Sequence, residues 1–511
     1  MPQKRLAAID IGTNSIRCII VEACGESGYR ILDDEKATVR LGAGLHRSGN
    51  ISSQSWQAAG EALSRMRRIA EGFGVRAIEA VATSAVRKAC NGQQFLEDML
   101  ERGGFPIRVI SGEEEAELAT LSAWRHFDMK HSRHALIDIG GGSAEIVLAT
   151  GDHIEEVLSL EAGAIFMTDR FLSSEPILHG DLKGVQKYLR KQTRNLFEKH
   201  EFNLQQLIGS GGTITNIGRA VMAQRKESFN SVHGYEVLHS DLVHLLTMLA
   251  RLTPKERATV PGISPERADI IVAGVAVVEG LMRNLGANIL KINERGIREG
   301  LIIRSLQKHD LVSGDVSVLN WRTSVEELAR SCQANLGHAR QVARLALKLF
   351  DALREQVFFS EDDLLLLEAA ALLHDIGYFI SYKSHHKHSY HLIRHARLDG
   401  FSPRQKELVA NIARYHRAGL PKKKHPNFSH LSAEDQQLVQ QLGGILRLAD
   451  GLDRCRDQRV KELSCRIEGG RLYLKLHADC EDLSVEVYGV NRKGDLFERA
   501  FGYKVLVERF S

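Results

Sequence analysis

The sequence has little proline, few aromatic residues and no long apolar run. Only 9 of its 511 residues are proline and 6% are aromatic, whereas 43% are hydrophobic and 26% are charged, a balance that excludes collagen-like, low-complexity and disordered classes. The best apolar run, 270–278, is nine residues long and meets Glu279, while a membrane-spanning helix needs about 20. Asp10 interrupts the N-terminal segment before any long apolar core, so we expect no signal peptide and a cytoplasmic protein.

Cysteine is also scarce. The seven cysteines form an odd-numbered set without a CxxC pair, at positions 18, 24, 90, 332, 455, 465 and 480. In a long cytoplasmic chain this usage predicts buried free thiols and argues against a disulfide framework or a zinc ribbon.

The first part of the chain carries no net charge, whereas one stretch of the last part is strongly basic. Residues 1–310 carry 38 basic and 38 acidic side chains, whereas the stretch 376–430 carries 11 basic, 2 acidic and eight histidine side chains. Such a stretch favours an anionic partner, which can be a nucleic acid, a membrane surface or polyphosphate; a solvated helix face is the alternative.

A repeat at domain scale organises the first three hundred residues. An apolar strand followed by Asp-Ile-Gly, two residues and Ser begins at Asp10 and again at Asp138, 128 residues later. Helical periodicity covers 54–73 and 113–126, and a short strand is predicted at 76–82. We therefore expect two similar α/β domains with a cleft between them.

The last two hundred residues have a different pattern of predicted secondary structure. Residues 323–351 and 360–374 have helical periodicity and predict an all-helical domain, whereas CRIEGGRLYLKLHA predicts a hairpin that turns at Gly469–Gly470, with strand alternation continuing through 484–490. About 100–200 residues per domain allows three or four domains. The expected boundaries are 1–126, 127–310, 311–458 and 459–511.

The repeated motif suits phosphate binding. Glycine lets successive backbone N–H groups turn toward a phosphate, a Ser or Thr hydroxyl adds a donor, and an aspartate at a strand end can hold Mg²⁺. A third glycine turn, GSGGT, lies at 209–213. Two copies at domain spacing with this third turn indicate phosphate-binding loops that face each other across a cleft.

Five motifs in order give a specific resemblance. DIGTNS (10–15), ATSAVR (82–87), ISGEEEA (110–116), DIGGGSAE (138–145) and GSGGT (209–213) together resemble the exopolyphosphatase and guanosine pentaphosphate phosphohydrolase family. HHKHS (385–389) and RYHR (414–417) resemble its long, four-domain members. The resemblance implies two actin-like (ribonuclease-H-like) α/β domains of the actin, sugar-kinase and heat-shock-protein ATPase superfamily, then an all-α HD-like domain and a small C-terminal α+β domain.

The same resemblance implies site residues. Glu115 would be the general base, although a run of glutamates at a helix start is also explained by the helix dipole alone. Asp138 and Glu145, with Asp10 as a third carboxylate, would hold Mg²⁺, and Arg87 would neutralise phosphate charge. The phosphate-binding set would be Thr13, Asn14, Ser15, Gly140, Gly141, Gly142, Ser143, Gly211, Gly212 and Thr213.

The helical part resembles HD-type metal phosphohydrolases in its order of histidine and aspartate residues. The set that would hold a second divalent metal is His338, His374, Asp375, His388, His416 and Asp450. A degenerate domain without metal, acting as a channel wall or regulatory site, is the alternative. Lys422, Lys423 and Lys424 are expected to form a track for a polyanion, which would keep a long substrate near the enzyme.

Four functions compete. The first is an exopolyphosphatase that releases orthophosphate by direct in-line hydrolysis, and the second hydrolyses the 5′-γ-phosphate of guanosine pentaphosphate with the same residues. A regulatory protein that senses phosphate or nucleotide is the third. A sugar or acetate kinase is disfavoured, because the acidic 110–116 segment supplies a water-activating base and no acceptor-sugar signature is found. We expect a homodimer, and neither a membrane nor a nucleic acid as partner.

Overall fold

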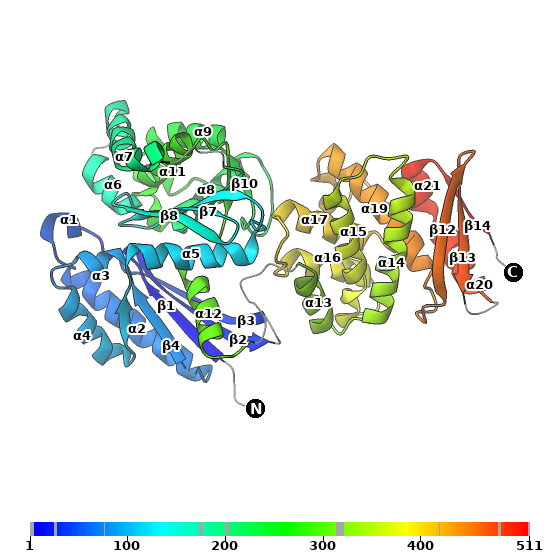
Figure 1. Cartoon of the computed structure of the whole chain (residues 1–511), viewed down its shortest axis with the longest axis horizontal. Coiled ribbons are helices and arrows are strands. Elements are labelled where there is room, and N and C mark those ends of the chain that lie inside the picture. The colour runs from blue at the N-terminus through cyan, green and yellow to red at the C-terminus, as the bar shows by residue number, and fades with distance from the viewer. Residues whose placement is uncertain are drawn as a thin grey trace. The chain divides into compact units, whose positions relative to one another are not determined.

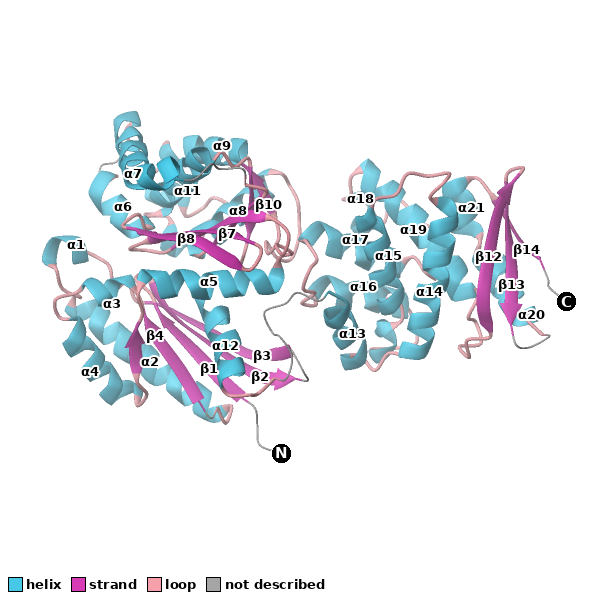
Figure 2. Ribbon diagram, viewed as in Figure 1, coloured by secondary structure: helices cyan, strands magenta, loops and turns pink. Residues whose placement is uncertain are grey.

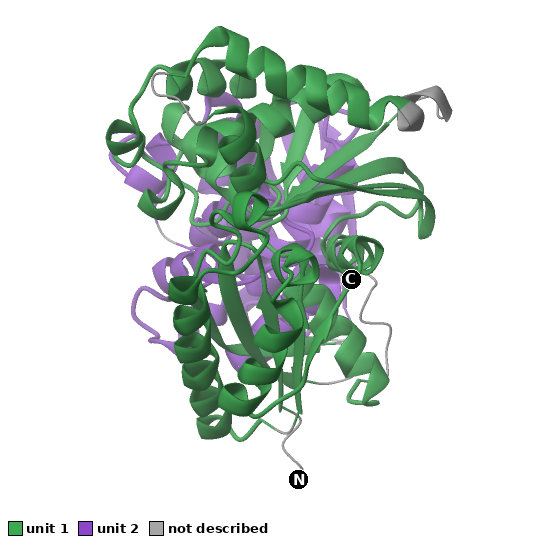
Figure 3. Cartoon of the chain, turned by 90° about the vertical axis from the view of Figure 1, so that its left-hand side faces the viewer, with its two compact units in different colours: residues 1–319 green, residues 320–511 purple. Residues whose placement is uncertain are grey.

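The computed structural model describes residues 5–24, 28–75, 77–172, 177–199, 204–312, 321–417, 419–478 and 482–508. Two compact units make up the chain, residues 1–319 (unit 1) and 320–511 (unit 2), coloured separately in Figure 3. Each unit is described by itself. Of the sequence predictions, strand residue Arg76 and the thiol of Cys480 lie outside the described residues.

The first sheet of unit 1 has five strands in the order β3-β2-β1-β4-β5 (Figure 1). They are β1 (Arg5–Ile11), β2 (Ser15–Cys24), β3 (Gly28–Thr38), β4 (Ala77–Ala82) and β5 (Ile107–Val109). Strands β1, β2 and β3 are antiparallel neighbours, whereas β4 and β5 run parallel to β1.

The second sheet repeats this topology. Its order is β10-β11-β9-β6-β7-β8, in which β8, β7 and β6 are antiparallel neighbours and β9 and β11 run parallel to β6. The strands are β6 (Arg133–Ile139), β7 (Ala144–Thr150), β8 (His153–Leu160), β9 (Gln206–Ser210), β10 (Glu236–Leu238) and β11 (Ile289–Ile292). Strand β10 adds an antiparallel edge. The sequence repeat is therefore a repeat of a whole sheet.

Helices cover both sheets of unit 1. Their bounds are α1 (Leu45–Ser48), α2 (Ser53–Gly72), α3 (Ser84–Lys88), α4 (Gly92–Gly103), α5 (Gly112–His126), α6 (Ala164–Phe171), α7 (His179–Lys199), α8 (Gly212–Gln224), α9 (His239–Ala250), α10 (Pro254–Arg257), η1 (Pro265–Arg267), α11 (Ile271–Leu285) and α12 (Ile297–Lys308). The predicted helices 54–73 and 113–126 match α2 and α5. Each begins at a serine cap, Ser52 or Ser111, whose side chain accepts a hydrogen bond from a backbone N–H three residues on.

The last helix of unit 1 returns to the first sheet. Leu301 and Ile302 of α12 join the buried cluster that contains Leu6 and Ala8 of β1. Helix α5 contributes Leu118 to the same cluster. Two helices that flank the second sheet in sequence are thus anchored on the first, and this packing fixes the first turn of α5 beside the ends of β1 and β6.

Unit 2 begins with a helical part (Figure 2). Its helices are α13 (Trp321–Ser331), α14 (Leu336–Leu353), α15 (Glu361–Leu373), η2 (Ile376–Phe379), α16 (His385–His395), α17 (Pro403–Arg414), α18 (Pro426–Ser429) and α19 (Ala433–Gly451). The helical periodicity predicted over 323–351 is confirmed, and it is divided between two helices because the chain breaks between α13 and α14. Gln333 there adopts a φ of 53°, and the Asn335 side chain caps α14 by accepting a hydrogen bond from His338 N–H.

A three-stranded sheet ends unit 2. The predicted hairpin is confirmed as β12 (Val460–Glu468) and β13 (Arg471–Ala478), with both turn glycines at positive φ. The strand expected over 484–490 is wrong: the segment forms α20 (Ser484–Lys493), because its buried positions Glu486, Gly489 and Val490 have helical spacing. After α21 (Asp495–Phe501), β14 (Lys504–Glu508) supplies the third strand, parallel to β13.

The cysteines of the described residues are free thiols, as predicted, but they are not uniformly buried. Cys18 and Cys332 are buried, whereas Cys24 and Cys90 are exposed because they lie at a strand end and in a turn. Among the described helices, none is both long enough and apolar enough to cross a membrane.

Candidate functional sites

The two copies of the repeated motif form equivalent turns. Gly12 N–H donates to Ser15 C=O at 3.1 Å, and Gly140 N–H donates to Ser143 C=O at 3.0 Å. Each turn joins the first strand of its sheet to the second. Thr13, Asn14, Ser15, Gly140, Gly141 and Ser143 line one cleft of unit 1. Gly142 is not among the lining residues; a Cβ added there would meet the side chains of Ser84 and Thr13.

The residue across from each strand-end aspartate differs between the copies. Asp10 faces Arg17 on the neighbouring strand, whereas Asp138 faces Glu145. Burial raises the pKa of Asp10 to about 6 against the lowering effect of Arg17. The first copy therefore places an arginine across from its aspartate, and the second places two carboxylates side by side.

Glu115 comes from the first turn of α5 and completes an acidic set. Its carboxylate lies with those of Asp138 and Glu145, all three offering oxygens within 4.8 Å of one another. Arg87 Nη1 lies 3.5 Å from Glu115 Oε2 and also donates to the Ile110 carbonyl. Asp10 lines the same cleft without joining this set.

The three carboxylates are buried and repel one another. Burial, followed by the charges of Glu145 and Asp138, raises the pKa of Glu115 well above its usual range. Burial and then Asp138 raise the pKa of Glu145 to about 8. Ser210 Oγ donates to Asp138 Oδ1 at 2.7 Å and Ser159 Oγ to Glu145 Oε1 at 3.0 Å, while Glu145 Oε2 has no hydrogen-bond partner. This chemistry suits a cation with oxygen ligands.

The third glycine turn closes the cleft from the second sheet. Gly211 has a φ of 99°, and a Cβ there would lie 2.5 Å from the Ile139 carbonyl oxygen. Gly211 and Gly212 line the cleft as expected, but Thr213 does not: it is buried against Gly274 of α11, and Thr215 takes its place on the wall. The two threonines are two residues apart, about half a helical turn, so they lie on different faces of α8.

The sequence analysis missed the basic wall of the cleft. Arg17, Arg267, Arg295 and Arg298 line it. Burial lowers the pKa of Arg267 to about 10. These arginines are scattered through the chain and belong to no motif, so only the fold brings them together.

Gly163 was also missed. A Cβ there would collide with the backbone of Gly141 and Gly142, and Ile165 N–H at the start of α6 donates to the Gly141 carbonyl at 2.8 Å. Gly163 therefore holds the second turn against α6. The small residues of the Glu-Ala-Gly-Ala segment around Gly163 are the sequence feature that could have indicated this close packing.

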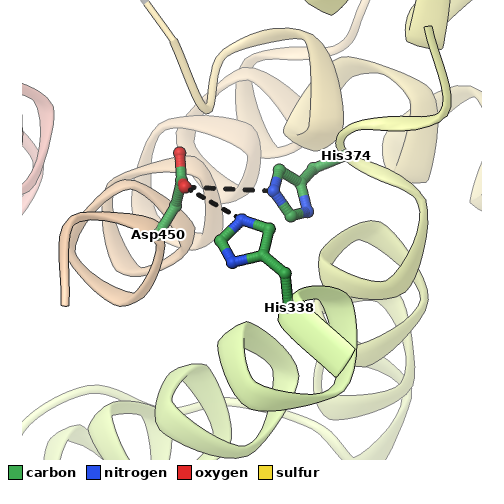
Figure 4. Close-up of side chains that lie close together, drawn as sticks. All are labelled: His338, His374 and Asp450. Atoms are coloured by element: carbon green, nitrogen blue, oxygen red, sulfur yellow. Dashed lines mark ion pairs between the residues drawn. The ribbon is translucent and has the colours of Figure 1, made fainter. Parts of the chain in front are cut away.

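Unit 2 holds a second cluster, at the centre of its helices. His338, His374 and Asp450 come together from α14, the end of α15 and α19 (Figure 4). Asp450 Oδ1 lies 3.5 Å from His338 Nε2 and 3.9 Å from His374 Nε2. All three side chains are buried, and both Nε2 atoms lack a hydrogen-bond partner. Two imidazoles and a carboxylate that converge in this way suit a divalent metal.

Asp375 and His416 belong to an adjacent group. Their third member is His385, not His388: ligand atoms of Asp375, His385 and His416 lie within 4.8 Å of one another. His388 is half-buried one turn further along α16. Because α16 begins at His385, the first histidine of the HHKHS segment faces the cluster, and the sequence does not fix this helix rotation.

The expected polyanion track lies on the surface of unit 2. Lys422, Lys423 and Lys424 are exposed in the connection between α17 and α18. The connection is anchored next to them, where Tyr415 OH and His425 Nδ1 lie 3.0 Å apart.

Comparisons with known proteins identify the family. A family model described as the Ppx/GppA phosphatase family matches residues 19–309, more than half of the chain. A second model, described as Ppx/GppA phosphatase, domain III, matches residues 321–485.

Two solved structures resemble the chain. The Aquifex aeolicus member of the Ppx/GppA family is 25% identical, with 60% of this chain and 99% of that chain covered and a TM-score of 0.53. An exopolyphosphatase from Cytophaga hutchinsonii is 26% identical, with 60% and 98% covered and a TM-score of 0.57. The chain therefore belongs to the Ppx/GppA phosphatase family and is a hydrolase that acts on phosphoric anhydride bonds.

Proposed function

We propose that the chain is an exopolyphosphatase, which hydrolyses the terminal phosphoanhydride bond of inorganic polyphosphate processively and releases orthophosphate. The observation that supports this most is the buried set of Glu115, Asp138 and Glu145 beside two equivalent glycine turns. The similarity to a structure named as an exopolyphosphatase also supports it. Within this proposal, unit 1 is a pair of actin-like domains and the helical part of unit 2 is HD-like.

Mg²⁺ is the proposed cofactor. Asp138 and Glu145 would hold it, with Asp10 close by; the Glu145 Oε2 and Asp10 Oδ1 atoms are buried without hydrogen-bond partners, which fits a cation with oxygen ligands. When bound, Mg²⁺ would offset the charge of these carboxylates and of the substrate's phosphate oxygens.

Glu115 is the proposed general base. A water oxygen forms a bond to the terminal phosphorus, the bridging P–O bond breaks, and the shortened chain leaves with the bridging oxygen. The water proton goes to the Glu115 carboxylate. Arg87, 3.5 Å from Glu115, would orient that carboxylate and meet phosphate charge. Backbone N–H groups of the turns at Thr13 and Gly141 would hold the phosphate groups in line.

Guanosine pentaphosphate is the alternative substrate. A second pocket shares Arg17, Arg267 and Arg298 with the cleft and extends past Asn216 and Arg219, which leaves room for a group beyond the scissile phosphate. The same catalytic set would serve both substrates. A phosphate- or nucleotide-sensing protein without turnover is the third reading, and the intact acidic set argues against it.

The test measures orthophosphate release with Mg²⁺ from long-chain polyphosphate and from guanosine pentaphosphate. Glu115→Gln is expected to lose release from both by on the order of 100-fold or more. Glu117→Gln, an exposed glutamate on the same helix, is the matched control and is expected to keep full activity. The ratio of wild-type rates identifies the preferred substrate. Full activity of Glu115→Gln would refute the assignment of the base.

For unit 2 we propose a second divalent metal at His338, His374 and Asp450, whose unpartnered Nε2 atoms support it. We also propose that Lys422, Lys423 and Lys424 guide long polyphosphate, that the domains follow the predicted boundaries, and that the chain works in the cytoplasm as a homodimer.

A further inference from the structure

A further group of ligand-type side chains in unit 2 shares no residue with the histidine clusters. Ligand atoms of Cys455, Asp457 and Glu486 lie within 4.8 Å of one another. Cys455 and Asp457 belong to the connection from α19 to β12, whereas Glu486 belongs to α20. One thiol and two carboxylates differ in kind from the histidine sets, because sulfur is a soft ligand.

The crossing of two helices fixes the position of Glu486. Gly489 of α20 packs so closely against Gly451, the last residue of α19, that a Cβ at Gly489 would collide with the Gly451 backbone. Glu486 lies three residues before Gly489 and therefore on the same buried face of α20. This face brings a carboxylate to the point at which the chain leaves α19.

The carboxylate of Glu486 is buried and only partly hydrogen-bonded. The residue is 1% exposed. Its Oε1 atom accepts a long hydrogen bond from Cys455 N–H at 3.4 Å, whereas its Oε2 atom has no hydrogen-bond partner among the described residues. The dipole of α20 offsets part of the charge, because Glu486 lies in the first turn of that helix. A buried carboxylate oxygen without a partner costs free energy, and a cation beside it would remove that cost.

The thiol of Cys455 faces this carboxylate. Burial, followed by the hydrogen bond to Glu486 and the charge of Glu486, raises the pKa of the Cys455 thiol above its usual range. The side chain is half-buried, so a dissolved cation can reach it. Because the thiolate is the ligand, a bound cation takes the place of the thiol proton.

Asp457 completes the group from the solvent side. It is exposed, and its Oδ2 atom lies 2.6 Å from Arg459 Nε. The charge of Arg459 also acts on Cys455, whose pKa it lowers against the larger effects of burial and Glu486. A thiolate and two carboxylates carry more negative charge than one arginine offsets, and a divalent cation would balance the remainder.

We propose that Cys455, Asp457 and Glu486 form a Zn²⁺ site, with a water molecule as the fourth ligand, which joins the α19–β12 connection to α20. Zn²⁺ accepts thiolate and carboxylate ligands together, whereas Mg²⁺ and Mn²⁺ are better suited to oxygen ligands. Arg456 and Gln458 in this connection have φ values of 61° and 58°, which are costly for residues with side chains. A cation bound across the connection would stabilise that conformation.

Absorption by bound Co²⁺, a spectroscopic substitute for Zn²⁺, is the first test. A thiolate ligand gives Co²⁺ a charge-transfer band in the near ultraviolet that oxygen and nitrogen ligands do not give, and the other metal sites proposed for the chain contain no cysteine. Titration of Co²⁺ into the full, reduced chain is expected to produce this band. The band is expected to be lost in Cys455→Ser and to require Co²⁺ concentrations higher by on the order of tenfold or more in Glu486→Gln.

Two variants serve as matched controls for this titration. Cys90→Ser and Glu462→Gln change an exposed cysteine and an exposed glutamate, and both are expected to keep the band and its Co²⁺ dependence. Circular dichroism checks that each variant is folded. No band in the wild type, or a band that persists in Cys455→Ser, would overturn the site. An unchanged Co²⁺ dependence in Glu486→Gln would overturn the part assigned to the buried carboxylate and with it the three-residue site.

Protection of the thiol is the second test and needs no variant. Iodoacetamide labels the wild-type chain with and without Zn²⁺, and peptide mass spectrometry compares Cys455 with the exposed Cys24 and Cys90. Zn²⁺ is expected to slow the labelling of Cys455 by on the order of tenfold or more and to leave the other two unchanged. An unchanged rate at Cys455, or equal slowing of all three, would overturn the site. Protection by Mn²⁺ as strong as that by Zn²⁺ would overturn the assignment of Zn²⁺.

Discussion

Arg17 and Glu145 hold equivalent positions in the two halves of unit 1, each directly across from the aspartate that ends the neighbouring strand. The arginine places a positive charge across from Asp10, whereas the glutamate adds a second buried carboxylate beside Asp138. Two sheets with the same topology have therefore acquired opposite electrostatics at the same point. This asymmetry supports the proposal that Mg²⁺ is held at the second sheet.

The first prediction follows from that asymmetry. Glu145→Gln removes one of two adjacent carboxylates, so Mg²⁺-dependent orthophosphate release is expected to fall by on the order of 100-fold. Asp10→Asn is expected to cost less and to shift the Mg²⁺ concentration for half-maximal rate less, because Asp10 lies outside the set of Glu115, Asp138 and Glu145. Magnesium titrations of both variants provide the measurement, and a larger Mg²⁺ shift in Asp10→Asn would contradict it.

The second prediction concerns Gly211. Its φ of 99° and the 2.5 Å approach of an added Cβ to the Ile139 carbonyl leave no room for a side chain. Gly211→Ala is expected to destabilise unit 1 by about 1–3 kcal/mol from backbone strain alone and to distort the third turn. Gly286→Ala is the control, since that glycine has a φ of 66° but open space around it, and a loss near 1 kcal/mol is expected. Chemical denaturation compares the two; equal losses would show that the contact with Ile139 is unimportant.

The third prediction tests the support behind His338. Asp453 is buried and lies 2.7 Å from His338 Nδ1, so Asp453→Asn is expected to weaken divalent metal binding in unit 2 by about 10–100-fold. Asp457→Asn, an exposed carboxylate in the same connection, removes the same charge and is expected to have no such effect. Equilibrium dialysis with Mn²⁺ compares them, and equal affinities in the two variants would exclude this role for Asp453.

The fourth prediction concerns thiol reactivity. Burial raises the pKa of Cys465 to about 12, and burial raises that of Cys18 to about 12 as well. Since the thiolate is the reactive form, both are expected to be alkylated slowly at pH 8 and faster as the pH rises toward 12. The exposed Cys24 and Cys90 should react first. Peptide mass spectrometry after timed iodoacetamide treatment measures the order, and early labelling of Cys465 would contradict it.

The parts of unit 1 that follow from local chemistry were predictable from sequence. Strand-end aspartates, glycine turns and the serine caps of α2 and α5 depend on residues next to one another in the chain. The approach of Glu115 to Glu145 was predictable only through the family resemblance, because 30 residues, which include most of α5 and the whole of β6, separate them in the chain. The arginines of the cleft wall were not predictable, since Arg267 and Arg298 reach it from segments that carry no motif.

Most of the wrong predictions of site residues concern the rotation of a helix about its axis. Thr213 and Thr215 exchange roles across α8, and His385 takes the place expected for His388 on α16. In 484–490, alternating valines suggested a strand, yet Gly489 packs against the backbone of Gly451 on α19, a close approach that a helix with glycine at that point allows. In each case the sequence fits two local arrangements about equally well, and tertiary packing determines which of them the chain adopts.

The last prediction tests the exposed lysines. Lys422, Lys423 and Lys424 lie on one surface connection of unit 2, where they can hold a long polyanion by charge alone. Changing all three to glutamate is expected to slow turnover of long-chain polyphosphate and to spare short substrates, with the difference shrinking as salt rises. Changing Lys187 and Lys191 of α7 and Lys255 of α10, three basic residues of unit 1, to glutamate gives a charge-matched control. Orthophosphate release from long and short chains at two salt concentrations measures the effect, and an equal loss on both substrates would refute the track.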